Sequence, residues 1–226
     1  MSAIIDRKLY LDQLINKKQN GLIKIITGIR RCGKSFLLFN LFYNHLIKSG
    51  VKESNIISLI LDDDKNRKYR DPDNLSKYLY SRIKKEMYFI LLDEVQFAIK
   101  NDETKNDNEI RLYGILNGLI RLDNVDIYIT ESNSKFLSSD ILTEFRGRGD
   151  EVRVYPLSFS EYYSSCANKD KLDVGNEYSM FGGMPALILK KTDEEKIKYL
   201  KDFINNTYIK DVIERNNIKN NTVIDS

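Results

Sequence analysis

Two groups of residues in this sequence have the types and spacing of a site that handles phosphate. The first occupies positions 28–35 and reads Gly-Ile-Arg-Arg-Cys-Gly-Lys-Ser, which fits the Walker A pattern G-x-x-x-x-G-K-S. Gly28 and Gly33 let the backbone bend so that several N–H groups converge on an anion. Lys34 can reach the β- and γ-phosphates of a nucleotide, and the Ser35 hydroxyl can bind Mg²⁺. The pattern therefore predicts a nucleoside triphosphate site.

The second group is the carboxylate pair Asp93 and Glu94, which directly follows the apolar run at 87–92. Such a run is typical of a central strand in a parallel sheet, which delivers its last residues to the active edge. We expect Asp93 to hold Mg²⁺, directly or through water, and Glu94 to polarise the attacking water. The pair alone is a weak signal. Together with the phosphate loop upstream, it indicates a hydrolytic nucleoside triphosphatase.

Apolar patterns predict the elements that position these residues. Apolar runs predict strands at 23–27, 55–61, 87–92, 125–130 and 151–155. Helices are predicted at 7–18, from the end of the loop to about 49, and at 74–85, 110–122 and 138–145. The alternation of strands and helices indicates the α/β class with a parallel sheet.

Composition limits the compartment and the partners. The 226 residues are 42% apolar, enough for one α/β domain with a small appendage. Lys and Arg number 36 against 33 Asp and Glu, so charge gives no argument for nucleic acid as a partner. No signal region or 18-residue apolar run occurs, and Cys32 and Cys166 lie far apart. We expect reduced thiols, a cytoplasmic location and no membrane association.

Three polar residues beyond the fourth strand are further candidates. Asn133 could hydrogen-bond the γ-phosphate or the attacking water, or it could be an ordinary turn residue. Arg146 and Arg148 lie on a glycine-flanked turn, from which they could reach phosphate charge or simply face solvent. The residues themselves leave these alternatives open.

Together these motifs resemble the prokaryotic AAA-like ATPases that join a P-loop domain to a winged-helix-like segment and a C-terminal nuclease-like domain of unknown function. The similarity runs from Asp6 to the end of the chain. Besides the loop and the Asp93-Glu94 pair, it is carried by the segments at 132–135, 145–149, 155–159 and 182–185.

The resemblance implies a three-layer P-loop core over 1–160 with the strand order 5-1-4-3-2, followed by a helical lid region over 161–226. It implies Asn133 as the γ-phosphate sensor and Arg146 or Arg148 as an arginine finger that acts on a neighbouring subunit of a homo-oligomer. It also puts Pro185 near the adenine. The cofactors are then ATP and Mg²⁺, with contacts from Gly28, Ile29, Arg30, Arg31, Cys32, Gly33, Lys34, Ser35, Phe36 and Pro185. Adenine is preferred because no Asn-Lys-x-Asp guanine reader occurs.

The chain departs from the family pattern in two ways. Members usually carry glycine where this chain has Glu131, and a carboxylate there is expected to add like charge beside the phosphates and to lower hydrolytic competence. Members also continue well beyond this length, so the chain is expected to be the ATPase half, with its C-terminal part missing.

Two other functions share the phosphate loop. An ATP-binding switch with little turnover is favoured by Glu131. A nucleotide-type kinase would need an acceptor pocket and a lid arginine cluster, whereas the Asp93-Glu94 pair favours water as the acceptor. ATP hydrolysis that drives or gates a conformational change is the preferred interpretation.

Overall fold

The computed structural model describes residues 5–99, 110–131, 145, 147–166 and 169–205. Its sheet contains β1 (Ile23–Thr27), β2 (Ile56–Ile60), β3 (Tyr88–Asp93), β4 (Val125–Thr130) and β5 (Gly149–Arg153). The strands lie in the order β2-β3-β4-β1-β5, and every neighbouring pair is parallel. Read from the β5 edge, this is the predicted order 5-1-4-3-2. The predicted α/β class and topology are confirmed.

Strand β5 begins two residues earlier than its sequence indicated. Gly149 already pairs with Ile23, and the Ile23 N–H donates to the carbonyl oxygen of Arg148 at 2.8 Å. The prediction started at Glu151 because glycine has low strand propensity and hides the beginning of the strand. Hydrogen bonding to the neighbouring strand overrides that local preference.

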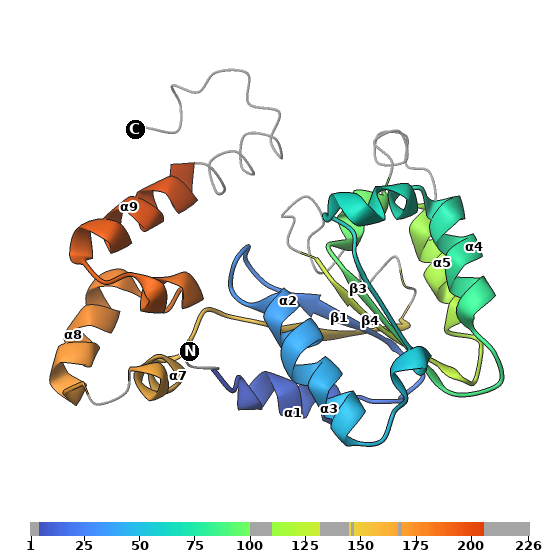
Figure 1. Cartoon of the computed structure of the whole chain (residues 1–226), viewed down its shortest axis with the longest axis horizontal. Coiled ribbons are helices and arrows are strands. Elements are labelled where there is room, and N and C mark those ends of the chain that lie inside the picture. Colours follow the sequence, from blue (N-terminus) through green and yellow to red (C-terminus); the bar gives the residue numbers. More distant parts are fainter. Residues whose placement is uncertain (1–4, 100–109, 132–144, 146, 167–168, 206–226) are drawn as a thin grey trace.

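Helices cover both faces of the sheet (Figure 1). One face is covered by α1 (Lys8–Asn16) and by the helical segment after the loop. That segment comprises α2 (Lys34–Phe36), a π-helical stretch (Leu37–Phe42) and α3 (Tyr43–Lys48). The opposite face is covered by α4 (Pro72–Arg82) and α5 (Arg111–Leu119). The core therefore has three layers, as predicted.

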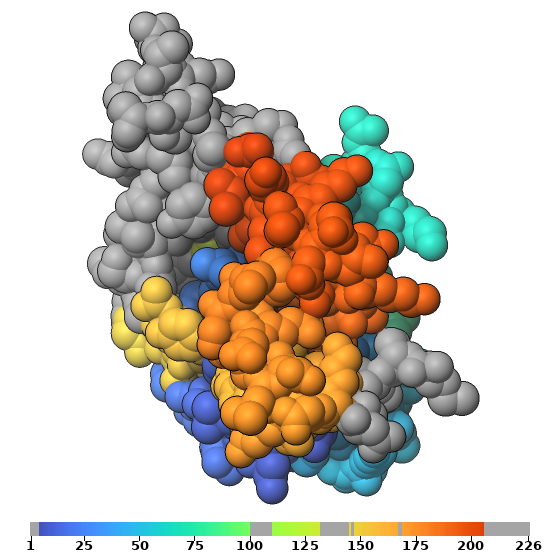
Figure 2. Space-filling model, turned by 90° about the vertical axis from the view of Figure 1, so that its left-hand side faces the viewer, coloured from blue at the N-terminus to red at the C-terminus, as the bar shows by residue number. Residues whose placement is uncertain are grey.

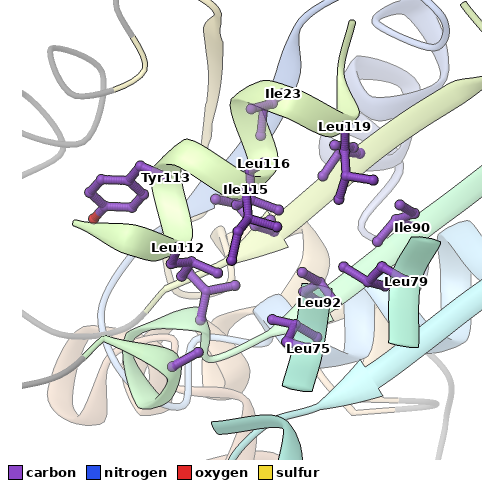
Figure 3. Packing of buried hydrophobic residues seen from close by; sticks show 14 of the residues in the cluster. Ile23, Leu75, Leu79, Ile90, Leu92, Leu112, Tyr113, Ile115, Leu116 and Leu119 are labelled. Atoms are coloured by element: carbon purple, nitrogen blue, oxygen red, sulfur yellow. The ribbon is translucent and has the colours of Figure 1, made fainter. Parts of the chain in front are cut away.

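Alternation along the strands separates the two apolar cores. Ile90 and Leu92 of β3 face α4 and α5, where they pack with residues such as Leu75, Leu79 and Leu116 (Figure 3). Phe89 and Leu91 belong to the cluster on the opposite face. Because both faces are covered, every residue of β1, β3 and β4 is buried. This explains why these strands appear in the sequence as nearly continuous apolar runs.

A third apolar cluster belongs to the helical region after β5. This region contains α7 (Phe159–Ser165), α8 (Lys171–Phe181), a 3-10 helix (Pro185–Leu189) and α9 (Asp193–Phe203). Its buried residues are Leu157, Tyr162, Val174, Phe181, Met184, Leu187 and Phe203. Figure 2, viewed from this side, shows the region in front of the core. The domain boundary at residue 160 stays a prediction.

Some predicted features lie outside the described residues, among them all of the 138–145 helix except Phe145. In the part of the chain that is described, no helix is long and apolar enough to cross a membrane.

Candidate nucleotide site

The phosphate loop connects the end of β1 to the start of α2 and turns on residues with positive φ. Gly28, Arg31 and Gly33 have φ values of 140°, 63° and 103°. A Cβ on Gly28 would lie 2.1 Å from the carbonyl oxygen of Val154, so no side chain fits there. The first glycine of the pattern is required both by its backbone conformation and by this close approach to the chain after β5.

Lys34 is folded into the loop that it terminates. Its side chain is only 3% exposed, and Nζ donates hydrogen bonds to the carbonyl oxygens of Gly28 at 2.8 Å and Ile29 at 3.0 Å. These carbonyls hold the ammonium group in place within the loop. Phosphate oxygens would offer the same ammonium stronger, charged acceptors.

Asp93, the last residue of β3, lies between the phosphate loop and the end of β4. Its carboxylate accepts a hydrogen bond from the Thr130 hydroxyl, and the Ser35 hydroxyl lies near enough to favour its ionised form. The Thr130 hydroxyl also accepts from the backbone N–H of Glu94 at 3.0 Å. Burial raises the pKa of Asp93 above its usual value, and the Thr130 and Ser35 hydroxyl groups oppose that rise. Thr130 therefore fixes β3 and β4 relative to each other at the carboxyl edge of the sheet.

The Ser35 hydroxyl and the Asp93 carboxylate fit a magnesium site. Mg²⁺ prefers oxygen ligands and is commonly held by one or two protein groups together with substrate phosphates and water. Ser35 lies near enough to Asp93 to lower the pKa of its carboxyl group. The donor set and its location beside Lys34 therefore suit a nucleotide-bound Mg²⁺.

Glu94 begins the 3-10 helix Val95–Ala98 with a left-handed backbone, at φ 53°. Its half-buried carboxylate accepts a hydrogen bond from the side-chain amide of Gln96. Gln96 thus orients the Glu94 carboxylate, which the sequence analysis expects to polarise the attacking water.

Glu131 directly follows β4 and lies within the site. Its side chain is buried, and burial raises the pKa of its carboxyl group to about 9. The charge of Glu94 raises this pKa further, whereas that of Lys34 lowers it. The raised pKa favours the neutral acid at neutral pH, whereas the sequence interpretation treated Glu131 as a carboxylate. The expected effect of Glu131 on hydrolysis stays a prediction.

Arg148 is not brought together with the phosphate loop. It precedes β5 at the amino edge of the sheet, where its carbonyl bonds the first residue of β1. The loop begins at the opposite end of β1, about 13 Å away. The role of Arg148 as an arginine finger for a neighbouring subunit stays a prediction. Asn133 and Arg146 lie outside the described residues.

The remaining loop residues differ in exposure. Ile29, Arg31 and Phe36 are exposed, and Arg30 is half-buried. Cys32 is a free, buried thiol whose Sγ donates to the carbonyl oxygen of Val154 at 3.4 Å. Burial raises the pKa of this thiol. Cys32 thus packs the loop onto the core.

Tyr199 and Pro185 of the helical region lie close to the phosphate loop. The Arg31 guanidinium lies 6.0 Å from the ring centroid of Tyr199 in α9. Cγ of Pro185 lies 3.9 Å from the position that a Cβ on Gly33 would take. The sequence singled out Pro185 but missed Tyr199 and Thr130. A hydroxyl residue ending the strand before Glu131 could have indicated Thr130, whereas no local pattern indicates Tyr199.

Comparison with known proteins identifies related chains. A family model described as AAA domain matches residues 20–163. An uncharacterized protein of Haemophilus influenzae is 30% identical over 233 residues, covering 99% of this chain and 54% of the relative. The uncharacterized protein MJ1544 of Methanocaldococcus jannaschii is 28% identical, covering 97% of this chain and 47% of the relative. The chain thus spans about half the length of these relatives.

Among solved structures, AMPPCP-bound DnaA from Aquifex aeolicus is 17% identical, with a TM-score of 0.47 over 97% of this chain and 67% of that chain. PCH-2 from C. elegans is 20% identical, with a TM-score of 0.46 over 70% of this chain and 41% of that chain. The family model covers more than half of the chain and includes the phosphate loop, the Asp93-Glu94 pair and all the strands of the sheet. The chain therefore belongs to the family of AAA domains.

Proposed function

We propose that this AAA domain binds ATP with Mg²⁺ and hydrolyses it to ADP and phosphate. The observation that carries the proposal is the connection across the carboxyl edge of the sheet. Asp93 accepts a hydrogen bond from Thr130, and Thr130 accepts one from the backbone N–H of Glu94. Ser35 of the loop lies close enough to Asp93 to favour its ionised form. A phosphate-binding loop and a carboxylate suited to polarise water are thereby held in one site, as water attack on a γ-phosphate requires.

Each residue has a separate role in this proposal. Lys34 and the loop N–H groups offset the charge of the phosphates, and Glu94 polarises the attacking water. Ser35 and Asp93 would hold Mg²⁺, which when bound supplies positive charge to the phosphate oxygens. Pro185, beside Gly33, belongs to the surface proposed to face the adenine. Binding at this surface would couple nucleotide state to the position of the helical region.

Two substitutions separate binding from turnover. Lys34→Ala should abolish ATP binding measured by calorimetry, because it removes the main side-chain charge that offsets the phosphates. Glu94→Gln should bind ATP but release phosphate at least about tenfold more slowly, because an amide polarises water poorly. Glu86→Gln removes an exposed carboxylate two residues before β3 and serves as the control. Unchanged ATP affinity in Lys34→Ala would refute the nucleotide site.

An ATP-dependent switch with little turnover is the second candidate. It is supported by the Gln96 amide, which donates a hydrogen bond to the Glu94 carboxylate and so occupies one of its acceptor sites. Steady-state phosphate release by the wild-type protein distinguishes the two functions. ATP binding with phosphate release no faster than in Glu94→Gln would favour the switch.

A further inference from the structure

Glu131 directly follows β4 at the carboxyl edge of the sheet. Strand β4 lies between β1 and β3, so its carboxyl end emerges between the phosphate loop and the Asp93-Glu94 pair. The Glu131 backbone N–H donates to the carbonyl oxygen of Ile26 at 3.2 Å, which holds the residue against β1. The preceding Thr130 is bonded to Asp93. The backbone of Glu131 is therefore fixed from both sides.

The side chain of Glu131 is buried but incompletely bonded. It is only 5% exposed, and Oε1 is buried with no hydrogen-bond partner among the described residues. The charges that act on it come from Lys34 at the start of α2 and from Glu94 after β3. A buried polar atom without a partner is costly, and in binding sites it commonly marks the place of a ligand atom. Here the neighbouring charges are those of the nucleotide site.

We propose that Glu131 binds the terminal phosphate of the nucleotide as a neutral carboxylic acid, donating its O–H in a hydrogen bond, so that an ionised Glu131 and a bound nucleotide exclude each other. This inference rests on the proposed function and adds a proton linkage to it. A neutral acid can donate to a phosphate oxygen, whereas a carboxylate would repel the phosphate and attract the ammonium of Lys34.

The direction of the pH dependence follows from this exclusion. The pKa of Glu131 is raised to about 9 in the nucleotide-free protein, and a bound phosphate adds negative charge that raises it further. Below pH 9 the free protein already carries the proton, so Glu131 adds no pH dependence to nucleotide binding. Above pH 9 the free protein must take up a proton to bind. Affinity should then fall toward tenfold per pH unit.

The test measures binding of Mg²⁺ and AMPPCP by calorimetry between pH 7 and 10, in two buffers of different ionisation enthalpy. Glu131→Gln imitates the neutral acid, and the control Glu86→Gln removes an exposed carboxylate. Across this range the wild type and Glu86→Gln should lose roughly tenfold in affinity relative to Glu131→Gln. Near pH 10 their binding should take up close to one proton more than that of Glu131→Gln. Each affinity is divided by that of Glu131→Gln at the same pH. This ratio removes the effect of lysines and tyrosines, which titrate at alkaline pH in all three proteins.

A second variant tests the hydrogen bond itself. Glu131→Leu fills similar space without a donor and should bind the nucleotide roughly tenfold more weakly at pH 7, where Glu131→Gln stays close to wild type. Identical pH profiles for wild type and Glu131→Gln would overturn this inference while leaving the proposed function intact. Absence of binding by the wild type at every pH would overturn both.

Discussion

Backbone conformation at single residues decides whether the phosphate loop can form. Gly28 combines a φ of 140° with an approach to the carbonyl oxygen of Val154 that leaves no space for a Cβ. The sulfur of Cys32 would also lie 3.1 Å from that Cβ. Gly114, in the middle of α5, has neither constraint, since a Cβ there would meet nothing within 4 Å.

Gly28→Ala and Gly114→Ala should therefore have opposite effects. The first should deform the loop, abolish detectable ATP binding and lower the free energy of unfolding, because the clash is with backbone. The second should leave binding unchanged and stabilise the protein by up to about 1 kcal/mol, because alanine favours the helix. Calorimetry and urea denaturation measure the two effects. Normal ATP affinity in Gly28→Ala would show that the loop can shift away from Val154.

The sequence identified the residues whose function follows from a local pattern. The loop at 28–35 and the Asp93-Glu94 pair have fixed spacing within one strand–loop unit, so their types were informative on their own. The raised pKa of Glu131 was not predictable. It results from burial between segments that are about 100 residues apart along the chain, at Lys34 and at β4.

At the level of elements, a buried ion pair joins β1 to β4 near the amino edge of the sheet. Lys24 Nζ donates to Asp126 Oδ1, and Lys24 is fully buried. The Tyr128 hydroxyl and the backbone N–H of Gln19 each donate to Asp126 Oδ2 at 2.9 Å. Burial lowers the pKa of Lys24, and Asp126 opposes that change. The pair fixes the relative position of the strands that carry the phosphate loop and Glu131.

Lys24→Met should cost about 3–5 kcal/mol of unfolding free energy, because it leaves the Asp126 carboxylate buried without its counter-charge. Lys17→Met provides a matched control, since Lys17 pairs with Asp150 where both side chains are partly exposed. Its cost should be about 1 kcal/mol or less. Urea denaturation at neutral pH compares them. Equal losses of unfolding free energy in the two variants would show that the buried pair stabilises the protein no more than the partly exposed one.

The order of the elements could be predicted more fully than their boundaries. The strand order came from the family resemblance and is confirmed, whereas the start of β5 was misplaced by two residues. Gly149 has no side chain to indicate a strand, and its pairing with Ile23 is determined by a segment far away in sequence. The sequence also gave no sign of the buried pair, because a lysine in an isoleucine-rich strand carries no local signal of its partner.

At the level of the whole molecule, Arg7 connects the core to the helical region. It is 3% exposed, and its guanidinium donates to the carbonyl oxygens of Cys32 at 3.4 Å and Tyr155 at 2.6 Å. Nε also lies 3.3 Å from the carboxylate of Glu161 in α7. One side chain thus contacts the phosphate loop, the segment after β5 and the first helix of the helical region. Movement of α7 should therefore be transmitted to the loop.

Arg7→Ala should loosen the phosphate loop and α7 together. Their amide hydrogens should exchange about tenfold faster or more, because the two carbonyl oxygens lose their donor and Glu161 loses its counter-charge. Arg7→Lys should rescue this only in part, since an ammonium group lacks the planar fork that reaches several acceptors at once. Lys8→Ala, which removes the exposed neighbouring cation, is the control and should leave exchange unchanged. Faster exchange confined to α1 in Arg7→Ala would mean that Arg7 merely secures its own helix, and that the loop and the helical region move independently.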